Sequence, residues 1–150
     1  MIFTIPGKPQ GKARARTFYN SRLGRSQSVT PEKTVLYENY VKECYLTAKK
    51  REKWFDGEPL QMCITAFFDI PKSTSKKKRQ KMLKEEVLPT KKPDVDNIAK
   101  VICDALNGIA YHDDTQIVSL NVSKVYTETE PRVLVGIYKY EPEEKDLWQE

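Results

Sequence analysis

Residues 60–70 read LQMCITAFFDI, and apolar side chains occupy every second position of this stretch. The even-numbered positions from Leu60 to Ile70 are all apolar, whereas Gln61 and Thr65 lie between them. Alternation with a period of two predicts a β-strand that presents one face to a hydrophobic core. A glycine before the stretch and a proline directly after it bound the strand.

Apolar residues recur at helical spacing on both sides of this strand. The stripe before it predicts a helix from Pro31 to about Lys50, and the stripe after it predicts a helix that follows Pro93 and stops at Asn107-Gly108. Between the strand and the second of these helices, a serine- and threonine-capped helix is expected from Lys76 to about Val87. The two stripes consist of Tyr37, Val41, Cys44, Tyr45 and Ala48, and of Ile98, Ile102, Ala105, Leu106 and Ile109.

Three further stretches complete the expected fold. Ile2–Ile5, Val118–Val122 and Arg132–Tyr140 are each typical of a strand. The order β-α-β-α-α-β-β predicts an α+β fold, with one mixed, mostly antiparallel sheet of about four strands and helices on one face. We expect a single domain over residues 1–140 and a disordered tail over 141–150, where acidic side chains predominate.

The amino-acid composition limits the kinds of functional site that this chain can form. The chain has 150 residues, 31% of them charged, and a net charge of +5, which fits one soluble domain with an anionic partner. His112 is the only histidine, and Cys44, Cys63 and Cys103 are far apart, so zinc, redox and most nucleophilic-triad chemistries are disfavoured. No apolar stretch is long enough to span a bilayer or to form a secretory signal, so we expect a cytoplasmic protein without a membrane partner.

Residues 8–30 carry no hydrophobic periodicity and no acidic side chain, and we interpret them as a long basic loop. Phe18 and Tyr19 lie among its basic residues. These rings are suited either to stacking on unpaired bases or to anchoring the loop on its own domain. The helix expected at 76–87 is also strongly cationic, and its charged face is either simply solvated or contacts phosphates.

The most informative segment is residues 92–100, KPDVDNIAK. Asp96, Lys100 and Asp104 share one face of the predicted helix, opposite its apolar stripe. Asp94 lies in the extended stretch just before that helix. These residues also have an explanation without a ligand, because aspartates cap helices and opposite charges four residues apart form surface pairs.

A second acidic group, Asp113 and Asp114, falls where a strand begins, so folding could bring it near the first group. In isolation this pair would signal only a turn. Converging carboxylates repel one another unless a cation lies between them, and an all-oxygen ligand set suits Mg²⁺ or Mn²⁺. Such an ion would polarise a phosphate and help to generate hydroxide, while Lys100 would neutralise charge on the phosphorus.

Residues 92–100, the run DALNG at 104–108 and the run DDTQI at 113–117 together resemble the RusA family of Holliday-junction resolvases. The basic run at 5–16 is similar to that family's N-terminal motif, so the resemblance covers about residues 2–140. It implies a Mg²⁺-dependent endonuclease, with Mn²⁺ as a substitute ion. It also implies a homodimer that resolves four-way DNA junctions by paired symmetric nicks in recombination and repair.

Carried over position by position, the resemblance implies that Asp94, Asp96 and Asp114 are catalytic metal ligands and that Lys100 is the catalytic lysine. Asp113 is the reserve for Asp114, because the segment before the acidic pair is shorter here than in some relatives. The expected nucleic-acid contacts are Lys8, Lys12, Arg14, Arg16, Lys76, Lys77, Lys78 and Arg79.

Other interpretations remain open on the sequence alone. A non-catalytic basic module would bind nucleic acid and use the aspartates as caps. A D-x-D transferase would hold a nucleotide diphosphate through Mg²⁺, although no glycine-rich phosphate loop is present. A dimer would suit a junction with two-fold symmetry. Cys63 and Phe67, on the second face of the strand at 60–70, either form its interface or are covered by a helix of the same chain.

Overall fold

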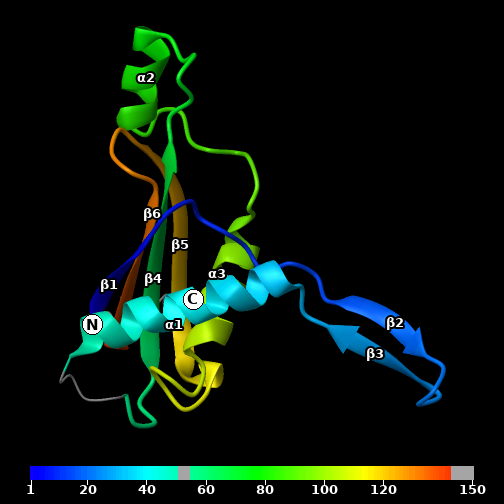
Figure 1. The fold of residues 1–150 in the computed structure, drawn as a ribbon. Helices are drawn as coiled ribbons and strands as arrows, with labels where there is room; N and C mark the ends of the chain where they lie inside the picture. The colour runs from blue at the N-terminus through cyan, green and yellow to red at the C-terminus, as the bar shows by residue number, and fades with distance from the viewer. Residues whose placement is uncertain (51–54, 143–150) are drawn as a thin grey trace, which may run out of the picture.

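The computed structural model describes residues 1–50 and 55–142, so nearly all of the expected acidic tail lies outside the described residues. Figure 1 shows the arrangement of the elements. The helices are α1 (Glu32–Lys49), α2 (Lys76–Leu83) and α3 (Val95–Leu106), with a short 3₁₀ helix η1 (Asp114–Gln116). The strands are β1 (Ile2–Pro6), β2 (Arg16–Asn20), β3 (Arg25–Val29), β4 (Leu60–Asp69), β5 (Ile117–Thr127) and β6 (Arg132–Lys139).

The main sheet has the strand order β1-β6-β4-β5. β4 is antiparallel to β6 and parallel to β5, and β1 extends the sheet antiparallel to β6. The parallel pair is joined by a long crossover that contains α2 and α3, as parallel strands require. The predicted α+β fold with a mixed, mostly antiparallel sheet is confirmed.

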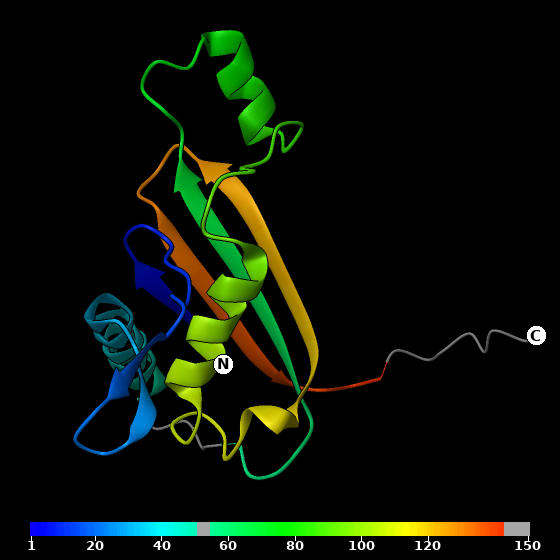
Figure 2. The same ribbon diagram turned by 90° about the vertical axis from the view of Figure 1, so that its right-hand side faces the viewer.

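α1 and α3 pack on the face of the sheet where the even-numbered residues of β4 are buried (Figure 2). Val41 and Tyr45 of α1 join Ile98 and Ile102 of α3 in the same core. The Tyr45 ring also meets Phe3 of β1 edge to face, with ring centroids 5.6 Å apart. This core fixes α3 on the sheet and leaves its charged face toward solvent.

The opposite face of the sheet carries no helix within the described residues. Cys63 and Phe67 lie there in register with β6, next to Leu134 and Tyr138, whose side chains are 37% and 40% exposed. The Arg132 guanidinium lies 4.1 Å from the centroid of the Phe67 ring. The interpretation in which a helix of the same chain covers Cys63 and Phe67 is therefore wrong, because the helices pack on the other side.

The segment at 8–30, expected to be a loop, contains a hairpin of β2 and β3 that projects from the domain (Figure 1). Its strands pair only with each other, so no alternation of buried side chains marks them in the sequence. The Asn20 side chain accepts hydrogen bonds from the amides of Arg22 and Leu23, and Gly24 has a φ of +61°. Local turn chemistry thus forms the hairpin, and the loop prediction is wrong for this part.

α2 stands at the end of the sheet where β4 ends (Figures 1 and 2). The Ser75 hydroxyl accepts the Lys78 amide, which confirms the predicted cap. The helix stops at Leu83 and not near Val87, because Glu85 adopts a φ of +61°. Among the described helices, none combines the length and the apolar character needed to cross a membrane.

Candidate functional site

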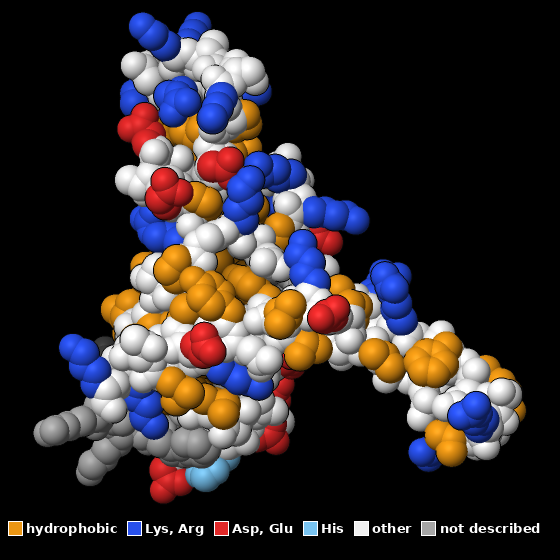
Figure 3. All heavy atoms as spheres, in the orientation of Figure 1, with side chains coloured by type: hydrophobic (Ala, Val, Ile, Leu, Met, Phe, Trp, Pro, Cys, Tyr) orange, Lys and Arg blue, Asp and Glu red, His pale blue; other side chains and the backbone are white. Residues whose placement is uncertain are grey.

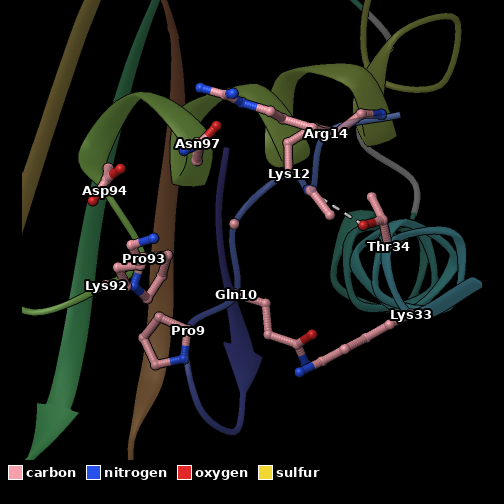
Figure 4. Close-up of a pocket in the computed structure, with 12 residues that line it drawn as sticks. Pro9, Gln10, Lys12, Arg14, Lys33, Thr34, Lys92, Pro93, Asp94 and Asn97 are labelled. Atoms are coloured by element: carbon pink, nitrogen blue, oxygen red, sulfur yellow. Dashed lines mark hydrogen bonds between the residues drawn. The ribbon is translucent and has the colours of Figure 1, made fainter. Parts of the chain in front are cut away.

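Asp94, Asp96 and Lys100 are exposed and lie along the first part of α3. Asp94 is the N-cap residue, with extended backbone angles of −73° and 153°, but its side chain makes no capping hydrogen bond. The capping interpretation therefore does not account for this carboxylate. Figure 4 shows Asp94 at the start of the helix, on the edge of a cleft.

Lys100 lies one helical turn from Asp96. Across residues 1–50 and 55–142, no ion pair involves Lys100. Asp104 is paired instead with Lys12, whose Nζ lies 3.0 Å from Asp104 Oδ2. The interpretation of these charges as surface pairs along the helix is therefore wrong, and the Lys100 ammonium is available to an anionic ligand.

Asp113 and Asp114 differ in what they contact. The Asp113 side chain accepts the Thr115 amide at the start of η1, and the Gln116 side chain accepts the Asp113 amide in return. A hydrogen bond between the two carboxyls, slight burial and the charges of Asp113 and Asp104 raise the pKa of Asp114. The same hydrogen bond lowers the pKa of Asp113. The turn interpretation thus describes Asp113, and Asp114 is the carboxylate without a capping role.

Asp114 lies beside the C-terminal half of α3. Burial raises the pKa of the Cys103 thiol to about 11, and the charges of Asp114 and Asp104 add to this shift. Asp96 precedes Asp104 by eight residues, a separation of about 12 Å along the helix axis. Within the described residues of one chain, no three metal-ligating side chains are close enough to share an ion. One chain therefore does not gather Asp94, Asp96 and Asp114 at a point.

The start of α3 nevertheless offers donors that suit magnesium. Mg²⁺ is usually bound by one or two carboxylates together with water and substrate phosphate. Asp94 and Asp96 are two such carboxylates, and both are exposed. Neither is an imidazole or a thiolate, which are the ligands typical of zinc. The pair fits Mg²⁺ with a phosphate bound beside it, and Asp114 is not part of this donor set in the single chain.

A cleft of about 750 Å³ lies between the N-terminal segment, the start of α1 and the start of α3 (Figure 4). Its lining includes the cations Arg14, Lys33 and Lys92 together with Asp94. Lys33 and Lys92 were not among the predicted contacts. Only the packing of α1 against α3 brings them to one cleft, so no spacing in the sequence could have identified them.

Residues 10–13, here called the strap, pass between α1 and α3. The Lys12 amide donates a hydrogen bond to the Asn97 carbonyl at 2.8 Å. A Cβ on Gly11 would lie 2.9 Å from side-chain atoms of both Asn97 and Pro93, so only glycine fits this crossing without displacement. The strap therefore lies directly against the chain segment that carries Asp94.

Lys12 was predicted to contact nucleic acid, but its ammonium is already occupied. It forms ion pairs with Glu38 of α1 and Asp104 of α3, and the side chain is only 20% exposed. Burial alone would lower the pKa of Lys12, but the hydrogen bonds to Glu38 and Asp104 outweigh it and raise this pKa. Sequence reasoning missed Glu38, which is 26 residues away on another element.

Most of the other expected nucleic-acid contacts are exposed, and basic side chains are visible over α2 and over the hairpin of β2 and β3 (Figure 3). Arg79 is half-buried and lies 3.9 Å from Glu128, in the turn between β5 and β6. The exposed side chains are those of Lys8, Arg14, Arg16, Lys76, Lys77 and Lys78. The surface is thus cationic on both sides of the exposed aspartates.

Phe18 and Tyr19 are 48% and 68% exposed at the middle of β2. They do not anchor the hairpin to the domain, so that interpretation is wrong. Successive side chains of a strand point to opposite faces, so the two rings lie on opposite faces of the hairpin.

The chain is similar to known proteins over nearly its whole length. It is 39% identical over 137 residues to the uncharacterized protein YqaN of Bacillus subtilis (strain 168), and this match covers 90% of the present chain and 93% of YqaN. The family model described as endodeoxyribonuclease RusA matches residues 6–138, which include the hairpin, the start of α3 and the acidic pair at 113–114. A match over nearly the whole chain establishes that this protein belongs to the RusA family of endodeoxyribonucleases.

Proposed function

We propose that this protein is a Mg²⁺-dependent, structure-selective endonuclease that resolves Holliday junctions by paired symmetric nicks in DNA recombination and repair. Family membership supports the reaction class. The observation that carries the assignment is that Asp94, Asp96 and Lys100 are exposed and without ion pairs among the described residues. Two carboxylates and an ammonium that are left unpaired on one helix can bind a divalent cation and the phosphodiester of an approaching DNA strand.

In this proposal Asp94 and Asp96 hold the divalent cation, with Mn²⁺ as a substitute for Mg²⁺. When bound, the cation supplies Lewis-acid activation of the phosphate and of water. Lys100, one turn further along α3, places its ammonium against the scissile phosphate and offsets the negative charge that develops on its oxygens. No step requires a nucleophilic side chain of the protein.

The cationic surfaces hold the DNA against the repulsion of the aspartates. Phosphates on one side would contact the exposed Lys8, Arg14 and Arg16, and those on the other would contact α2. One of the two exposed rings of β2 would stack on a base left unpaired at the centre of the junction. This arrangement favours branched DNA over an uninterrupted duplex, in which every base is already stacked.

A homodimer suits the substrate, because a four-way junction with near two-fold symmetry is cut on two strands by two identical sites. Asp114 is the third proposed ligand. Asp114 lies toward the other end of α3 from Asp94 and Asp96. Within the described residues of one chain it is therefore not close enough to share an ion with them.

The assignment is tested with a synthetic four-way junction and the Asp96→Asn variant. We expect nicking by the wild type in Mg²⁺, no nicking in EDTA, and a loss of at least about a hundredfold in the variant with junction binding retained. Glu43→Gln is the matched control, because Glu43 is an exposed carboxylate of α1 that forms no ion pair among the described residues. Wild-type cutting by Asp96→Asn would refute the assignment.

The non-catalytic basic module is the competing outcome of the same assay. It requires junction binding without cleavage in any divalent ion, and binding that is unchanged in Lys100→Ala. The D-x-D transferase requires instead that a nucleotide diphosphate with Mg²⁺ raises the melting temperature of the protein.

A further inference from the structure

Residues 88–93, here called the linker, belong to no helix or strand and lead directly to Asp94. Figure 2 shows the chain running from α2 past the end of the sheet to the start of α3. Within the described residues, no backbone–backbone hydrogen bond involves the linker. Whatever fixes the chain just before Asp94 must therefore come from side chains or from packing.

One side chain, Lys124 of β5, supplies the hydrogen bonds that the linker backbone lacks. Its ammonium donates to the carbonyls of Lys91 and Pro93, and the second of these bonds is 3.0 Å long. In the part of the chain that the structure describes, no other hydrogen bond reaches the linker backbone. Bonds from a charged donor are about twice as strong as bonds between neutral groups. Lys124 thus ties the end of the linker to the sheet.

The surroundings of Lys124 restrict its side chain to this contact. Lys124 lies opposite Ala66 in the ladder between β4 and β5, and Ala66 is fully buried on the face that carries α3. The Lys124 ammonium also lies 5.5 Å from the centroid of the Phe68 ring, which is itself buried. A buried ring and two carbonyls therefore hold the ammonium under the linker.

The strap meets the same proline. A Cβ on Gly11 would lie 2.9 Å from Pro93 Cβ, so the strap and Pro93 are already in close contact. The Lys12 amide also donates to the Asn97 carbonyl in the first turn of α3. Pro93 is thus held both by the strap and by Lys124.

Lys124 can affect Asp94 only through the backbone. No ion pair joins the two residues among those that the structure describes. The Asp94 side chain makes no capping hydrogen bond that would orient it. The Pro93 carbonyl and the Asp94 amide, however, belong to one planar peptide group. A donor that fixes this carbonyl therefore also fixes the direction in which the Asp94 side chain leaves the backbone.

We propose that Lys124 is a positioning residue, whose ammonium holds the Pro93 carbonyl and thereby directs the Asp94 carboxylate toward the cation and the scissile phosphate. The inference rests on the proposed function, in which Asp94 holds the divalent cation. Groups that orient a metal ligand typically contribute about 10- to 100-fold to metal affinity or activity. In this role Lys124 contacts neither the cation nor the DNA.

A direct phosphate contact is the competing role for a cation in this place. The two roles differ in what the loss of the ammonium changes. A phosphate contact contributes to the affinity for the junction and to the salt dependence of binding. A positioning contact contributes to nicking and leaves the affinity nearly unchanged.

The test measures nicking of a synthetic four-way junction by the full chain under single-turnover conditions in Mg²⁺. Lys124→Met keeps the apolar stem and removes the donors, and we expect it to nick about 10- to 100-fold more slowly. Its affinity for the junction in EDTA should stay within about twofold of the wild type. Lys124→Arg keeps a charged donor and should restore the rate to within about fivefold.

Lys91→Met is the matched control. The Lys91 ammonium lies 5.5 Å from the centroid of the same Phe68 ring, but the side chain is exposed and forms no ion pair among the described residues. Only its backbone carbonyl meets Lys124, and the substitution leaves this carbonyl in place. We expect Lys91→Met to nick at the wild-type rate.

Hydrogen exchange of the protein without DNA or metal gives a readout that does not depend on activity. The Ile98 amide donates to the Asp94 carbonyl at 3.0 Å in the first turn of α3. We expect exchange in residues 95–98 to be at least about threefold faster in Lys124→Met, while exchange in β4 is unchanged. Equal acceleration in β4 would overturn the proposal, because it would assign Lys124 a general role in stability.

Three results of the nicking assay would also overturn the positioning role: wild-type nicking by Lys124→Met, an equal loss in Lys91→Met, or a loss of junction affinity as large as the loss of nicking rate. If the wild type itself does not nick junctions, the proposed function fails. Faster exchange confined to residues 95–98 in Lys124→Met would then still support the anchoring of the linker by Lys124.

Discussion

Lys12 Nζ lies 3.0 Å from Asp104 Oδ2 and also forms an ion pair with Glu38, so a single side chain of the strap joins α1 to α3. The partner carboxylates are 17% and 32% exposed, which places this contact partly out of water. Removal of the lysine would leave two neighbouring carboxylates without their counter-charge. The strap would then lose its side-chain contact with both helices.

We expect Lys12→Met to lower the free energy of unfolding by about 1–2 kcal/mol, since a partly buried charge group loses its partner. Urea titration of the wild type and variant measures this change. Lys8→Met is the matched control, because Lys8 is exposed and forms no ion pair among the described residues, and it should stay within about 0.5 kcal/mol of the wild type. Equal stability of the two variants would contradict a clamping role for Lys12.

In the salt dependence of DNA binding, by contrast, Lys8 should have the larger effect and Lys12 the smaller one. Each phosphate contact contributes a slope of about 0.9 to the plot of log affinity against log salt concentration. We expect Lys8→Met to reduce this slope by about one contact and Lys12→Met to leave it unchanged, because the Lys12 ammonium is already paired. A reduced slope for Lys12→Met would show that this ammonium leaves its carboxylates to meet DNA.

The cationic helix α2 should contribute to binding through phosphate contacts alone. Replacement of Lys76, Lys77 and Lys78 by Gln should reduce the salt slope by about 2–3 and leave the stability nearly unchanged, since all three side chains are exposed. Lys139→Gln is the control, because Lys139 lies opposite Leu60 in the ladder between β4 and β6, at the end of β4 that is far from α2. An effect of Lys139→Gln as large as that of the α2 variant would indicate a general charge effect.

The two aromatic side chains of β2 should not be equivalent. Phe18 and Tyr19 lie on opposite faces of the projecting hairpin, so only one of them can meet a base in a given complex. We expect one of Phe18→Ala and Tyr19→Ala to weaken junction binding by about tenfold or more, as loss of a stacked base does, and the other to have little effect.

Binding to a four-way junction and to an uninterrupted duplex, measured in parallel, identifies that face. Thr17→Ala controls for changes in the hairpin itself. If neither ring affects the preference for the junction, the hairpin does not stack on its bases.

The elements that pack on the core could be predicted, because burial leaves a period in the sequence. The alternation in β4 and the apolar stripe of α3 predict these two elements, and the structure confirms both. The prediction that Asp94 lies in extended backbone just before the helix is also confirmed. The hairpin could not be found in this way, since its strands bury nothing. The partners of Lys12 were also beyond sequence reasoning, because Glu38 and Asp104 reach it only after α1 and α3 have packed together.

The position of Asp114 relative to Asp94 and Asp96 could not be predicted either, because it depends on how the elements pack. Spacing placed Asp96 and Lys100 on one exposed face of α3, and the structure has them there. The approach of Asp114 depended on where β5 begins relative to the two ends of α3. Because α3 runs back along the sheet, Asp114 lies toward the later turns of the helix. A sequence period carries no information on that direction.

Alkaline pH should weaken the packing of the strap through Tyr37. Burial raises the pKa of the Tyr37 hydroxyl to about 12, and a hydrogen bond with the Gln10 backbone only partly opposes this shift. The folded state therefore keeps this proton at pH values where the unfolded chain, with a pKa near 10, has lost it. The stability is fully present below pH 10 and declines as the pH rises toward 12.

Tyr37→Phe should make this decline shallower by up to about 1.4 kcal/mol per pH unit, since one fewer group must be held protonated. Urea midpoints measured from pH 8 to 11 compare the slopes, and Tyr19→Phe, at an exposed position, controls for the loss of a hydroxyl. Parallel slopes in Tyr37→Phe and the wild type would assign the alkaline transition to other groups, such as the buried Tyr111, whose pKa burial also raises.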